Sequence, residues 1–515
     1  MGNPTDMVNK VKTMSKTKIV VLSDIHIGTN APTVWYQKGI HEEYLIAVLD
    51  WVIENSQSIR ELILLGDIVD FWTYPPDEQP PSFDEIMAAN PKIFSSSGKL
   101  SEVLTALEGK ITYVRGNHDM TITQSDLDNI PNPNGYKITL SPDDIYYPLG
   151  NGNHRIVCTH GHLYTMFNAP YNNSNNSLKP LPLGQFITRA MAYKWQRHLE
   201  PGKTVADLDA SGEPNGICLD NLVNSVNDSV AETVLNYIVT LTGLEETHPI
   251  RMANNTETSI KEAKNIYRNL WSEWQSKSDG ITTSKSATAD LNGTFMGWFA
   301  QKLAFEVGAE LVIMGHTHKP ISGLKDSLIK YFNTGFNCPS KRDLSKKHPT
   351  FLIVDTDDCH AAVFQVVKER EVYTIQAAEA EETKVAAPFD FSCYLIIDNT
   401  QGNCDLDLLE YEPKPKHGHY IVAPPQKISR GEQGRFWLQD YLGTNGSEGW
   451  AKYSAQGREI NLTYQCPTAS NLVSLSSINN NCSGANFYTK SGGDSWGDLN
   501  QVKKLGHPFF VKFVL

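Results

Sequence analysis

Short runs of apolar and β-branched residues recur along the first two thirds of the chain and predict buried strands. The runs lie at 18–23, 61–65, 111–114, 155–158 and 311–314. Each run is short, continuous and bounded by polar residues, as expected of strands that are covered on both faces. Helical spacing at 44–54 and 100–107 separates several of the runs. Strands that alternate with helices predict an α/β domain.

Every one of these runs ends in a polar cluster. In chain order the clusters are Asp24-Ile25-His26, Gly66-Asp67-Ile68-Val69-Asp70, Arg115-Gly116-Asn117-His118-Asp119, Thr159-His160-Gly161-His162 and Gly315-His316-Thr317-His318. Residues two apart on an extended backbone point to the same face, and the carboxyl ends of parallel strands meet at one edge of a sheet. We therefore expect the five clusters to build one site. The proline-rich segment 74–91 predicts a loop near the same edge.

A long segment, residues 163–310, has helical periodicity. Helices are predicted at 184–199, 219–243 and 291–307, and one apolar face recurs at three- and four-residue spacing through Ile260, Ala263, Tyr267, Leu270 and Trp274. The segment begins directly after one polar cluster and returns directly before another. We expect a helical cap that covers the site as a lid or sets specificity; an insertion with a purely structural role is the alternative.

The pattern changes after the last polar cluster. Runs at 350–354 and 361–367 predict a hairpin that closes the sheet, whereas 376–388 is acidic and lacks an apolar period, which predicts a linker. Beyond it, strand-like runs alternate with Gly, Asn and Ser turns and predict an all-β sandwich; they lie at 393–397, 420–422, 435–438, 460–464 and 509–514. The predicted divisions are a flexible tail at 1–16, an α/β domain at 17–375, a linker at 376–388 and an all-β domain at 389–515.

Length, charge and cysteine usage narrow the class of protein. A chain of 515 residues is too long for one compact core. Its net charge of −13, without a basic stripe, argues against a protein that coats nucleic acid. The sequence shows neither a signal peptide nor an apolar run of about 18 residues, which predicts a cytoplasmic location. The eight cysteines form no Cys-x-x-Cys motif, so free thiols are expected, with disulfides as the alternative in an oxidising compartment.

The five clusters contain a set of candidate metal ligands. They are Asp24, His26, Asp67, Asn117, His160, His316 and His318. Carboxylate, amide and imidazole groups suit Mn²⁺, Fe and Zn²⁺, and Mn²⁺ is favoured here over Fe and Zn²⁺. Seven ligands exceed what one catalytic ion uses, but two ions that share a bridging carboxylate would use them well. Such a pair can hold a phosphate ester and activate hydroxide as a nucleophile.

In this order, Asp-x-His, Gly-Asp-x-x-Asp, Gly-Asn-His-Asp, His-Gly and Gly-His-x-His resemble the calcineurin-like metallophosphoesterase family over roughly residues 17–375. The resemblance implies a four-layer α/β/β/α sandwich with two metals at the sheet edge. It implies that Asp24, His26 and His318 hold the first metal, that Asn117, His160 and His316 hold the second, and that Asp67 bridges both. His118 matches the catalytic histidine of the family, and Asp70 matches the residue that orients it; an ordinary loop carboxylate is the alternative for Asp70.

The exact residues of the motifs suggest two narrower resemblances. Ser-Asp-Ile-His-Ile-Gly, Gly-Asp-Ile-Val-Asp-Phe-Trp and Gly-His-Thr-His-Lys-Pro are most similar to the bacterial UDP-2,3-diacylglucosamine hydrolase branch. That branch typically has arginine where this chain has His118, and its helical insertion is shorter. In the C-terminal segment, 431–437 and 444–450 resemble aegerolysin-type β-sandwiches, some of which bind membrane lipid.

These features predict a di-metal phosphoesterase that cleaves a phosphomonoester, phosphodiester or pyrophosphate by attack of a metal-bridging hydroxide. The expected partner is a small phosphorylated substrate, which Arg115 and His162 are predicted to contact. The alternative for Arg115 is a structural salt bridge. The alternative for His162 is a position behind the metal ligands or a contact with the cap. A lipid, carbohydrate or protein ligand is considered for the C-terminal domain, together with peripheral membrane association. The rival function is a non-catalytic binding protein with the α/β domain as scaffold; a nuclease is disfavoured by the acidic balance. The oligomeric state is not predicted.

Overall fold

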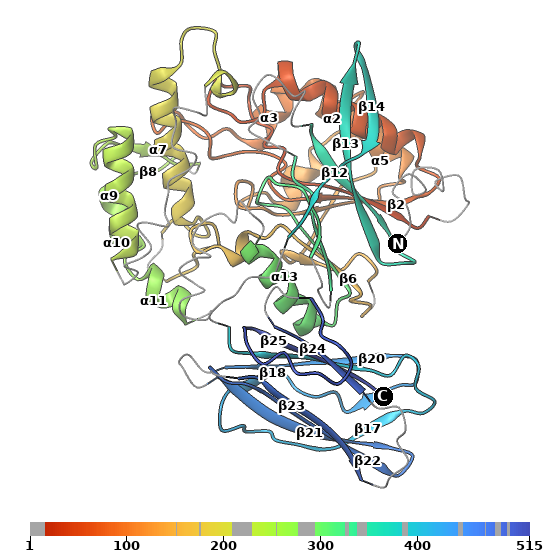
Figure 1. The fold of residues 1–515 in the computed structure, drawn as a ribbon. Coiled ribbons are helices and arrows are strands. Elements are labelled where there is room, and N and C mark those ends of the chain that lie inside the picture. Colours follow the sequence, from red (N-terminus) through yellow and green to blue (C-terminus); the bar gives the residue numbers. More distant parts are fainter. Residues whose placement is uncertain are drawn as a thin grey trace.

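The structure is a computed structural model of the 515-residue chain. It describes residues 16–150, 152–174, 177–208, 229–253, 255–276, 294–324, 329–336, 348–383, 390–440, 446–468, 470–478, 486–491 and 495–515. Figure 1 shows two β-rich parts, with a helical insertion beside the larger one.

The first sheet has seven strands in the order β14-β13-β12-β1-β2-β3-β4. Their bounds are β1 (Lys18–Leu22), β2 (Ile59–Leu65), β3 (Ile111–Val114), β4 (Thr139–Leu140), β12 (Thr350–Asp355), β13 (His360–Glu369) and β14 (Val372–Ala377). β1 to β4 are parallel neighbours, while β12, β13 and β14 add antiparallel strands on the other side of β1. The predicted hairpin at 350–354 and 361–367 is therefore confirmed as β12 and β13.

The second sheet has six strands in the order β15-β10-β11-β9-β6-β5. Their bounds are β5 (Ile145–Tyr146), β6 (Ile156–Thr159), β9 (Leu311–Met314), β10 (Ile321–Leu324), β11 (Lys330–Asn333) and β15 (Glu381–Thr383). β6, β9 and β11 run parallel. The neighbours β6 and β9 come from either side of the helical insertion, so the insertion leaves the sheet and returns to it at adjacent strands.

The two sheets pack face to face, and helices cover both outer faces. Ile19 and Val21 of β1 point into the apolar layer between the sheets, whereas Val20 and Leu22 point into the layer beneath the first group of helices. That group comprises α2 (Lys38–Glu54), α3 (Phe83–Ala89), α4 (Pro91–Phe94), α5 (Lys99–Ala106) and α6 (Gln124–Asp128). The second sheet is covered by α13 (Thr294–Val307). The four-layer α/β/β/α prediction is confirmed.

The helical insertion packs around its own apolar cluster. It contains α7 (Leu183–His198), α9 (Val230–Thr242), α10 (Ile260–Ile266) and α11 (Leu270–Gln275), with short elements η2 (His162–Tyr164), η3 (Val205–Asp207), β7 (Ile250–Arg251) and β8 (Glu257–Thr258). The apolar face predicted from 260 to 274 is divided between α10 and α11 and stays buried in both. Part of the helix predicted at 219–243, and residues 291–293 of that predicted at 291–307, lie outside the described residues.

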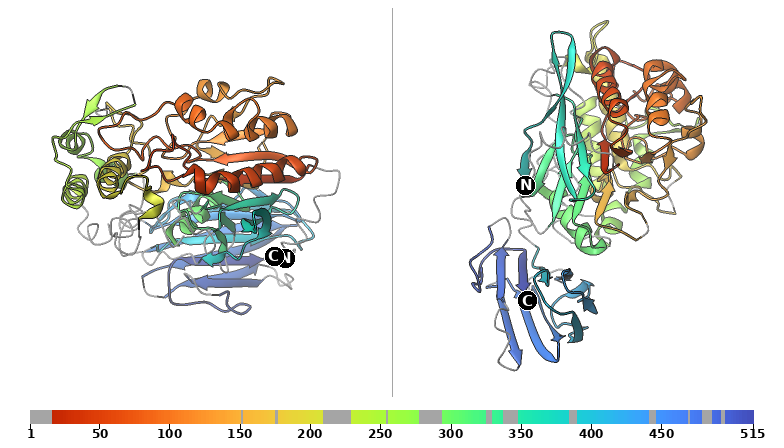
Figure 2. Two further views of the ribbon diagram at one scale, coloured as in Figure 1. Left: turned by 90° about the horizontal axis from the view of Figure 1, so that it is seen from above. Right: turned by 90° about the vertical axis from the view of Figure 1, so that its right-hand side faces the viewer.

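The C-terminal part consists of two five-stranded sheets. The right-hand view of Figure 2 shows this part below the rest of the chain. One sheet contains β16 (Cys393–Asp398), β18 (His419–Val422), β20 (Gln433–Gln439), β24 (Asn486–Ser491) and β25 (Phe509–Val514). The other contains β17 (Leu406–Tyr411), β19 (Lys427–Ile428), β21 (Ser447–Ala455), β22 (Arg458–Cys466) and β23 (Leu472–Ile478). Alternate residues of β21 and β22 point into the core between these sheets, and the others face outward. The C-terminal β-sandwich matches the predicted fold class.

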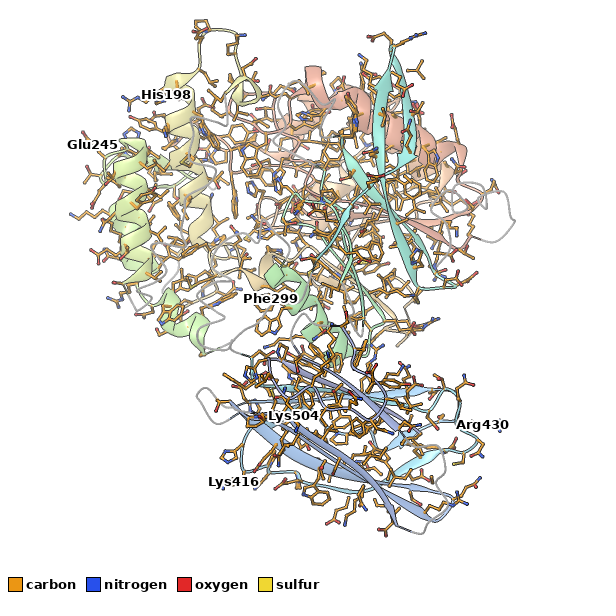
Figure 3. The ribbon with its side chains drawn as sticks, in the orientation of Figure 1. His198, Glu245, Phe299, Lys416, Arg430 and Lys504 are labelled. Carbon is orange, nitrogen blue, oxygen red and sulfur yellow. The ribbon has the colours of Figure 1, made fainter. Side chains whose placement is uncertain are left out.

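The C-terminal sandwich packs directly against α13. Trp298 and Phe305 of α13 share one apolar cluster with Tyr394, Trp437 and Phe510 of the first C-terminal sheet. Asp390 accepts hydrogen bonds from Trp298 Nε1 (2.8 Å) and from the Tyr394 hydroxyl (2.8 Å). Figure 3 labels Phe299 on α13, on the upper side of this junction, and Lys504 below it. α13 is therefore covered on both sides.

Two segments differ from the expected irregular structure. Within the predicted loop 74–91, residues 83–89 form α3 because Ser82 and Glu85 make a reciprocal capping box, which satisfies the first backbone N–H groups. Within the predicted linker 376–388, β14 extends to Ala377 and residues 381–383 form β15, which pairs with β10. Residues 384–388 lie outside the described residues. Among the helices that the structure describes, none is both long and apolar enough to cross a bilayer.

Candidate metal centre

The predicted site residues stand at the carboxyl ends of five strands from two sheets. Asp24 and His26 follow β1, Asp67 follows β2, and Asn117 follows β3; these three strands are parallel neighbours. His160 follows β6, and His316 and His318 follow β9 in the second sheet. Because the sheets are packed face to face, their polar ends meet at one edge. The structure thus brings the five clusters together.

The backbone at these positions is unusual. Asp24, His26, Asp67, His316 and His318 all have positive φ, between 53° and 73°. A left-handed conformation costs a non-glycine residue about 1–2 kcal/mol, and such residues concentrate at functional sites. Each turn at a strand end therefore holds a side chain at an energetic cost that the surrounding fold must offset.

Two glycines allow the strand ends to approach closely. A Cβ on Gly66, which has φ +78°, would lie 2.6 Å from the backbone nitrogen of Gly116 and 2.7 Å from the His160 ring. A Cβ on Gly116 would overlap the Asp67 carboxylate. The glycines of the Gly-Asp and Gly-Asn motifs are thus required by the contact between the loops after β2 and β3.

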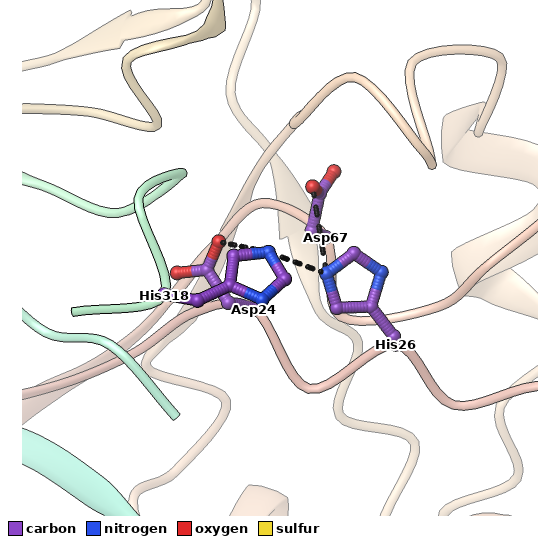
Figure 4. A group of neighbouring side chains, drawn as sticks. All are labelled: Asp24, His26, Asp67 and His318. Carbon is purple, nitrogen blue, oxygen red and sulfur yellow. Dashed lines mark hydrogen bonds and ion pairs between the residues drawn. The ribbon is translucent and has the colours of Figure 1, made fainter. Parts of the chain in front are cut away.

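Two groups of potential ligands share Asp67. Asp24, His26, Asp67 and His318 each place a ligand atom within 4.8 Å of the others, and Asp67, His160 and His316 do the same. Figure 4 shows the first group, in which His26 Nε2 lies 3.2 Å from His318 Nε2 and 3.8 Å from Asp67 Oδ2. On the other side, His160 Nε2 lies 3.2 Å from Asp67 Oδ2. Asp67 occupies the position of a carboxylate common to two sites.

Neighbouring groups fix which ring nitrogen of each histidine faces the centre. The Nδ1 atoms of His26 and His160 lie 3.0 Å from Asp70 Oδ2 and 2.8 Å from the Leu65 carbonyl oxygen. Because only an N–H can donate to these acceptors, Nδ1 carries a proton, and Nε2 is the ring nitrogen left to ligate a metal. The Nε2 atom of His316 lies within hydrogen-bonding distance of the Thr165 hydroxyl (3.1 Å) and of Asn168 Nδ2 (3.3 Å). Thr165 and Asn168 lie at the start of the helical insertion.

The donor set fits divalent metal ions. Asn117 Oδ1 is buried and accepts no hydrogen bond from any residue that the structure describes. A buried amide oxygen without a donor is costly unless a cation or water completes it. The centre offers carboxylate, amide and imidazole groups and no thiolate, as expected for Mn²⁺, Fe or Zn²⁺ rather than for a structural zinc site.

The charges of the site interact strongly. Burial would raise the pKa of Asp67, but the neighbouring His160, His118 and His26 hold it well below its usual range. Burial likewise opposes the ionisation of Asp70, yet His118 and His26 lower its pKa. Burial lowers the pKa of His160, but the negative charges of Asp67 and Asp24 outweigh the effect of burial and raise this pKa to about 10. Asp67 and Asp70 are therefore ionised at neutral pH, and the ionised Asp67 carboxylate is available as a ligand for a cation.

His118 and Asp70 form a pair beside the ligands. His118 Nδ1 lies 3.0 Å from the same Asp70 Oδ2 that contacts His26, and the backbone N–H of His118 donates to Asp67 Oδ1 at 2.8 Å. Burial lowers the pKa of His118, but Asp70 and Asp67 outweigh it and raise this pKa. With Nδ1 held by Asp70, Nε2 is the ring atom left to face a reacting group.

Asp119 is a structural residue to which the sequence analysis assigned no role. Its carboxylate accepts hydrogen bonds from the backbone of Gly116 (2.6 Å) and Ile68 (2.8 Å) and from the Tyr113 hydroxyl (2.5 Å). It thereby ties the loop after β3 to the loop after β2. Its place at the end of the Gly-Asn-His-Asp motif was the available signal.

The two predicted substrate contacts have other neighbours in the structure. Arg115 Nε donates to the Ile122 carbonyl at 3.1 Å, and its Nη1 lies 3.9 Å from Asp144. His162 is fully buried, with its ring 5.6 Å from that of His160, and burial lowers its pKa to about 3. Contact of Arg115 and His162 with substrate stays a prediction.

The sequence model of the calcineurin-like phosphoesterase family matches residues 17–320, more than half of the chain. The chain belongs to this family. It is accordingly a metal-dependent phosphoester hydrolase. No curated protein matches the chain.

Two solved structures show remote similarity. A dimetal phosphatase from Danio rerio is 11% identical, with a TM-score of 0.22, over 72% of this chain and 98% of its own. IP-1A from Alcaligenes faecalis is 12% identical, with a TM-score of 0.16, over 24% of this chain and 88% of its own. Neither the UDP-2,3-diacylglucosamine hydrolase branch nor the aegerolysin-type module is confirmed by these comparisons, and both stay predictions.

Proposed function

We propose that the centre holds two divalent metal ions. Asp24, His26 and His318 would hold the first ion; Asn117, His160 and His316 would hold the second; Asp67 would serve both. The observation that carries this proposal is the shared place of Asp67 in the two ligand groups. The Asn117 Oδ1 atom, which accepts no hydrogen bond from the described residues, supports the second set independently. Mn²⁺ is favoured, with Fe and Zn²⁺ as alternatives.

The proposed reaction is hydrolysis of a phosphomonoester, phosphodiester or pyrophosphate in a small substrate. When bound, the two ions would lower the pKa of water and polarise the phosphoryl group. The chain supplies the remaining chemistry through His118, which donates a proton from Nε2 to the leaving oxygen. Asp70 orients the ring of His118 through Nδ1 and stabilises its protonated form.

The alternative, a non-catalytic binding protein built on an α/β scaffold, is disfavoured by family membership and by the complete ligand set. A lipid, carbohydrate or protein ligand for the C-terminal sandwich, a cytoplasmic location and peripheral membrane association stay predictions.

Metal analysis and hydrolysis of p-nitrophenyl phosphate and bis(p-nitrophenyl) phosphate test the proposal on the full chain loaded with Mn²⁺. We expect about two ions per chain and hydrolysis of at least one probe. Asp67→Asn should remove nearly all activity and lower the metal content, because both ions lose a charged ligand. Asp405→Asn, which changes an exposed carboxylate paired with Lys427, is the control and should match the parent. An Asp67→Asn protein that retained activity would contradict the mechanism.

A further inference from the structure

The ring of His118 lies among three other rings. Its centroid is 4.5 Å from that of Trp72, with 30° between the planes, and 5.1 Å from that of Trp35, with 45° between them. The His26 ring contacts it edge-on at 4.6 Å. The Asp70 hydrogen bond fixes one ring nitrogen but leaves the ring free to tilt about that bond. The two indoles remove this freedom by packing against the ring.

Trp72 belongs to the same unit as Asp70. Its backbone N–H donates to Asp70 Oδ1 at 2.7 Å, while Oδ2 of the same carboxylate contacts His118. The indole is 1% exposed and lies in the apolar cluster of the helical insertion, with Phe167 and Phe186. Trp72 therefore joins the core of the insertion to the ring of His118.

The insertion also binds the segment that follows Trp72. Arg189 of α7 is fully buried, and its Nη2 donates to the carbonyl oxygens of Pro75 (3.0 Å), Pro76 (3.4 Å) and Glu78 (2.7 Å). The backbone N–H of Arg251 donates to Pro76 at 3.0 Å. The proline-rich segment is thus fixed to the insertion, and the position of the Trp72 indole depends on that attachment.

Trp35 approaches from the loop after β1. Its indole lies 4.6 Å from the His26 ring and 5.4 Å from the His318 ring, in addition to its contact with His118. Two bonds hold its loop: Thr33 Oγ1 donates to the Thr73 carbonyl at 2.6 Å, and the Val205 N–H donates to the Pro32 carbonyl at 2.8 Å. Trp35 is partly exposed, whereas Trp72 is buried.

We propose that Trp72 and Trp35 are positioning residues that set the ring of His118 for proton transfer, and that the helical insertion holds Trp72 in place. The proposal rests on the proposed function. In that reaction water adds its oxygen to phosphorus and gives up one proton to solvent, the bond between phosphorus and the leaving oxygen breaks, and the leaving oxygen takes the proton of His118 Nε2, which solvent then restores. A tilted ring would deliver this proton poorly, which matters most for a basic leaving oxygen.

The test compares phenyl phosphate, with a basic leaving oxygen, and p-nitrophenyl phosphate, with a weakly basic one. General acid catalysis contributes about 10²–10⁴-fold. We therefore expect Trp72→Leu to lose about tenfold or more in kcat on phenyl phosphate and less than about threefold on p-nitrophenyl phosphate. Trp72→Phe, which keeps a flat ring, should regain most of the loss, and metal content should equal that of the parent.

A double-variant cycle links the effect to His118. In a His118→Ala background, Trp72→Leu should have no further effect, because the residue through which it acts is gone. Trp35→Leu should show the same dependence on the leaving group, but to a smaller degree. If Trp72→Leu does not fold, Trp35→Leu is used for the test instead. Trp51→Leu is the matched control, since its indole packs on Phe351 of β12, and it should show no leaving-group dependence.

Equal losses on both phosphates, additive effects with His118→Ala, or losses that follow the metal content would each overturn the positioning role. A parent that cleaves only diesters is tested in the same way with diphenyl phosphate and bis(p-nitrophenyl) phosphate. If the Mn²⁺-loaded parent hydrolyses none of these four probes, the proposed function fails instead. The two failures are thus distinguishable.

Discussion

The α/β part and the C-terminal sandwich both place left-handed residues in exposed hairpin turns, but the α/β part also places them at buried strand ends. In the sandwich, positive φ falls on Gln456 and Gly457, the two central residues of the exposed turn between β21 and β22. In the α/β part it falls on Arg370 and Glu371 of the exposed turn between β13 and β14, and also on the buried Asp24, His26 and Asp67. The hairpin geometry itself requires positive φ at such a turn. No hairpin turn requires positive φ at the strand ends. We therefore infer that the conformational cost of the left-handed residues there is tolerated because it positions the side chains of the site.

The largest expected effect comes from replacing the proposed metal ligand His318, whose backbone is left-handed, with glycine. His318→Gly removes a ligand and should lower activity by about 10²-fold or more. Glycine adopts φ 55° without penalty, so the metal-free protein should unfold at the same temperature as the metal-free parent or above it. Activity assays and thermal melts with a chelator check both halves. A metal-free variant that melts well below the parent would show that the strand-end conformation carries no cost.

The junction between the two parts should give the next largest effect. Asp390→Ala removes the acceptor that Trp298 Nε1 and the Tyr394 hydroxyl share, and the loss of these two buried hydrogen bonds should lower the free energy of unfolding by about 1–3 kcal/mol. Asp390→Asn keeps an acceptor oxygen and should lose less. Urea unfolding measures the difference. Equal stability of the alanine variant and the parent would mean that the Asp390 hydrogen bonds contribute nothing to the junction of the two parts.

In the sandwich turn, Gln456→Gly should stabilise the protein by up to about 1 kcal/mol, because glycine removes the left-handed penalty at an exposed position. Activity should not change, since the turn lies in the C-terminal sheets. The contrast with His318→Gly is direct: the same backbone relief abolishes function at one site and leaves it intact at the other. A loss of activity in Gln456→Gly would break the contrast.

The smallest effect concerns a buried carboxylate away from the strand ends. Burial raises the pKa of Glu61, against hydrogen bonds from Thr112 and Tyr146. Burial thus favours the protonated form of Glu61 in the folded protein. The resulting contribution to the free energy of unfolding is fully present below the pKa that Glu61 has in the unfolded chain. It is lost as pH rises through the pKa that Glu61 has in the folded protein. Glu61→Gln stays neutral, and its melting temperature should fall less than that of the parent as pH rises from 4 to 8. Parallel pH profiles would contradict this.

The strand ends could be predicted from the sequence because their signals are local. An apolar run, a turn and a polar residue at fixed spacing describe β9 and His316 completely, and the bounds of β3 were predicted to the residue. The sheet edge then follows from the general rule for parallel strands. The sharing of Asp67 between two groups came from the family resemblance, since no local pattern distinguishes a bridging carboxylate.

Tertiary contacts account for what was missed. Trp35 lies nine positions after His26, and nothing in that spacing places its indole against three imidazoles. The capping box of Ser82 and Glu85 was obscured by the surrounding prolines. In the C-terminal part, most of the inward positions of β21 hold small residues (Ser447, Gly449, Ala451 and Ala455), so its alternation is weak in the sequence although it is strict in burial.

One consequence of α13 concerns how the protein can be produced. Its aromatic residues Trp298 and Phe305 pack in one apolar cluster with Tyr394, Trp437 and Phe510 of the sandwich. A chain cut at 388 would expose the two α13 side chains as a contiguous apolar patch, and such patches promote aggregation. Expression of the α/β part without the sandwich therefore requires polar replacements at Trp298 and Phe305; without them, the whole C-terminal sandwich has to be retained.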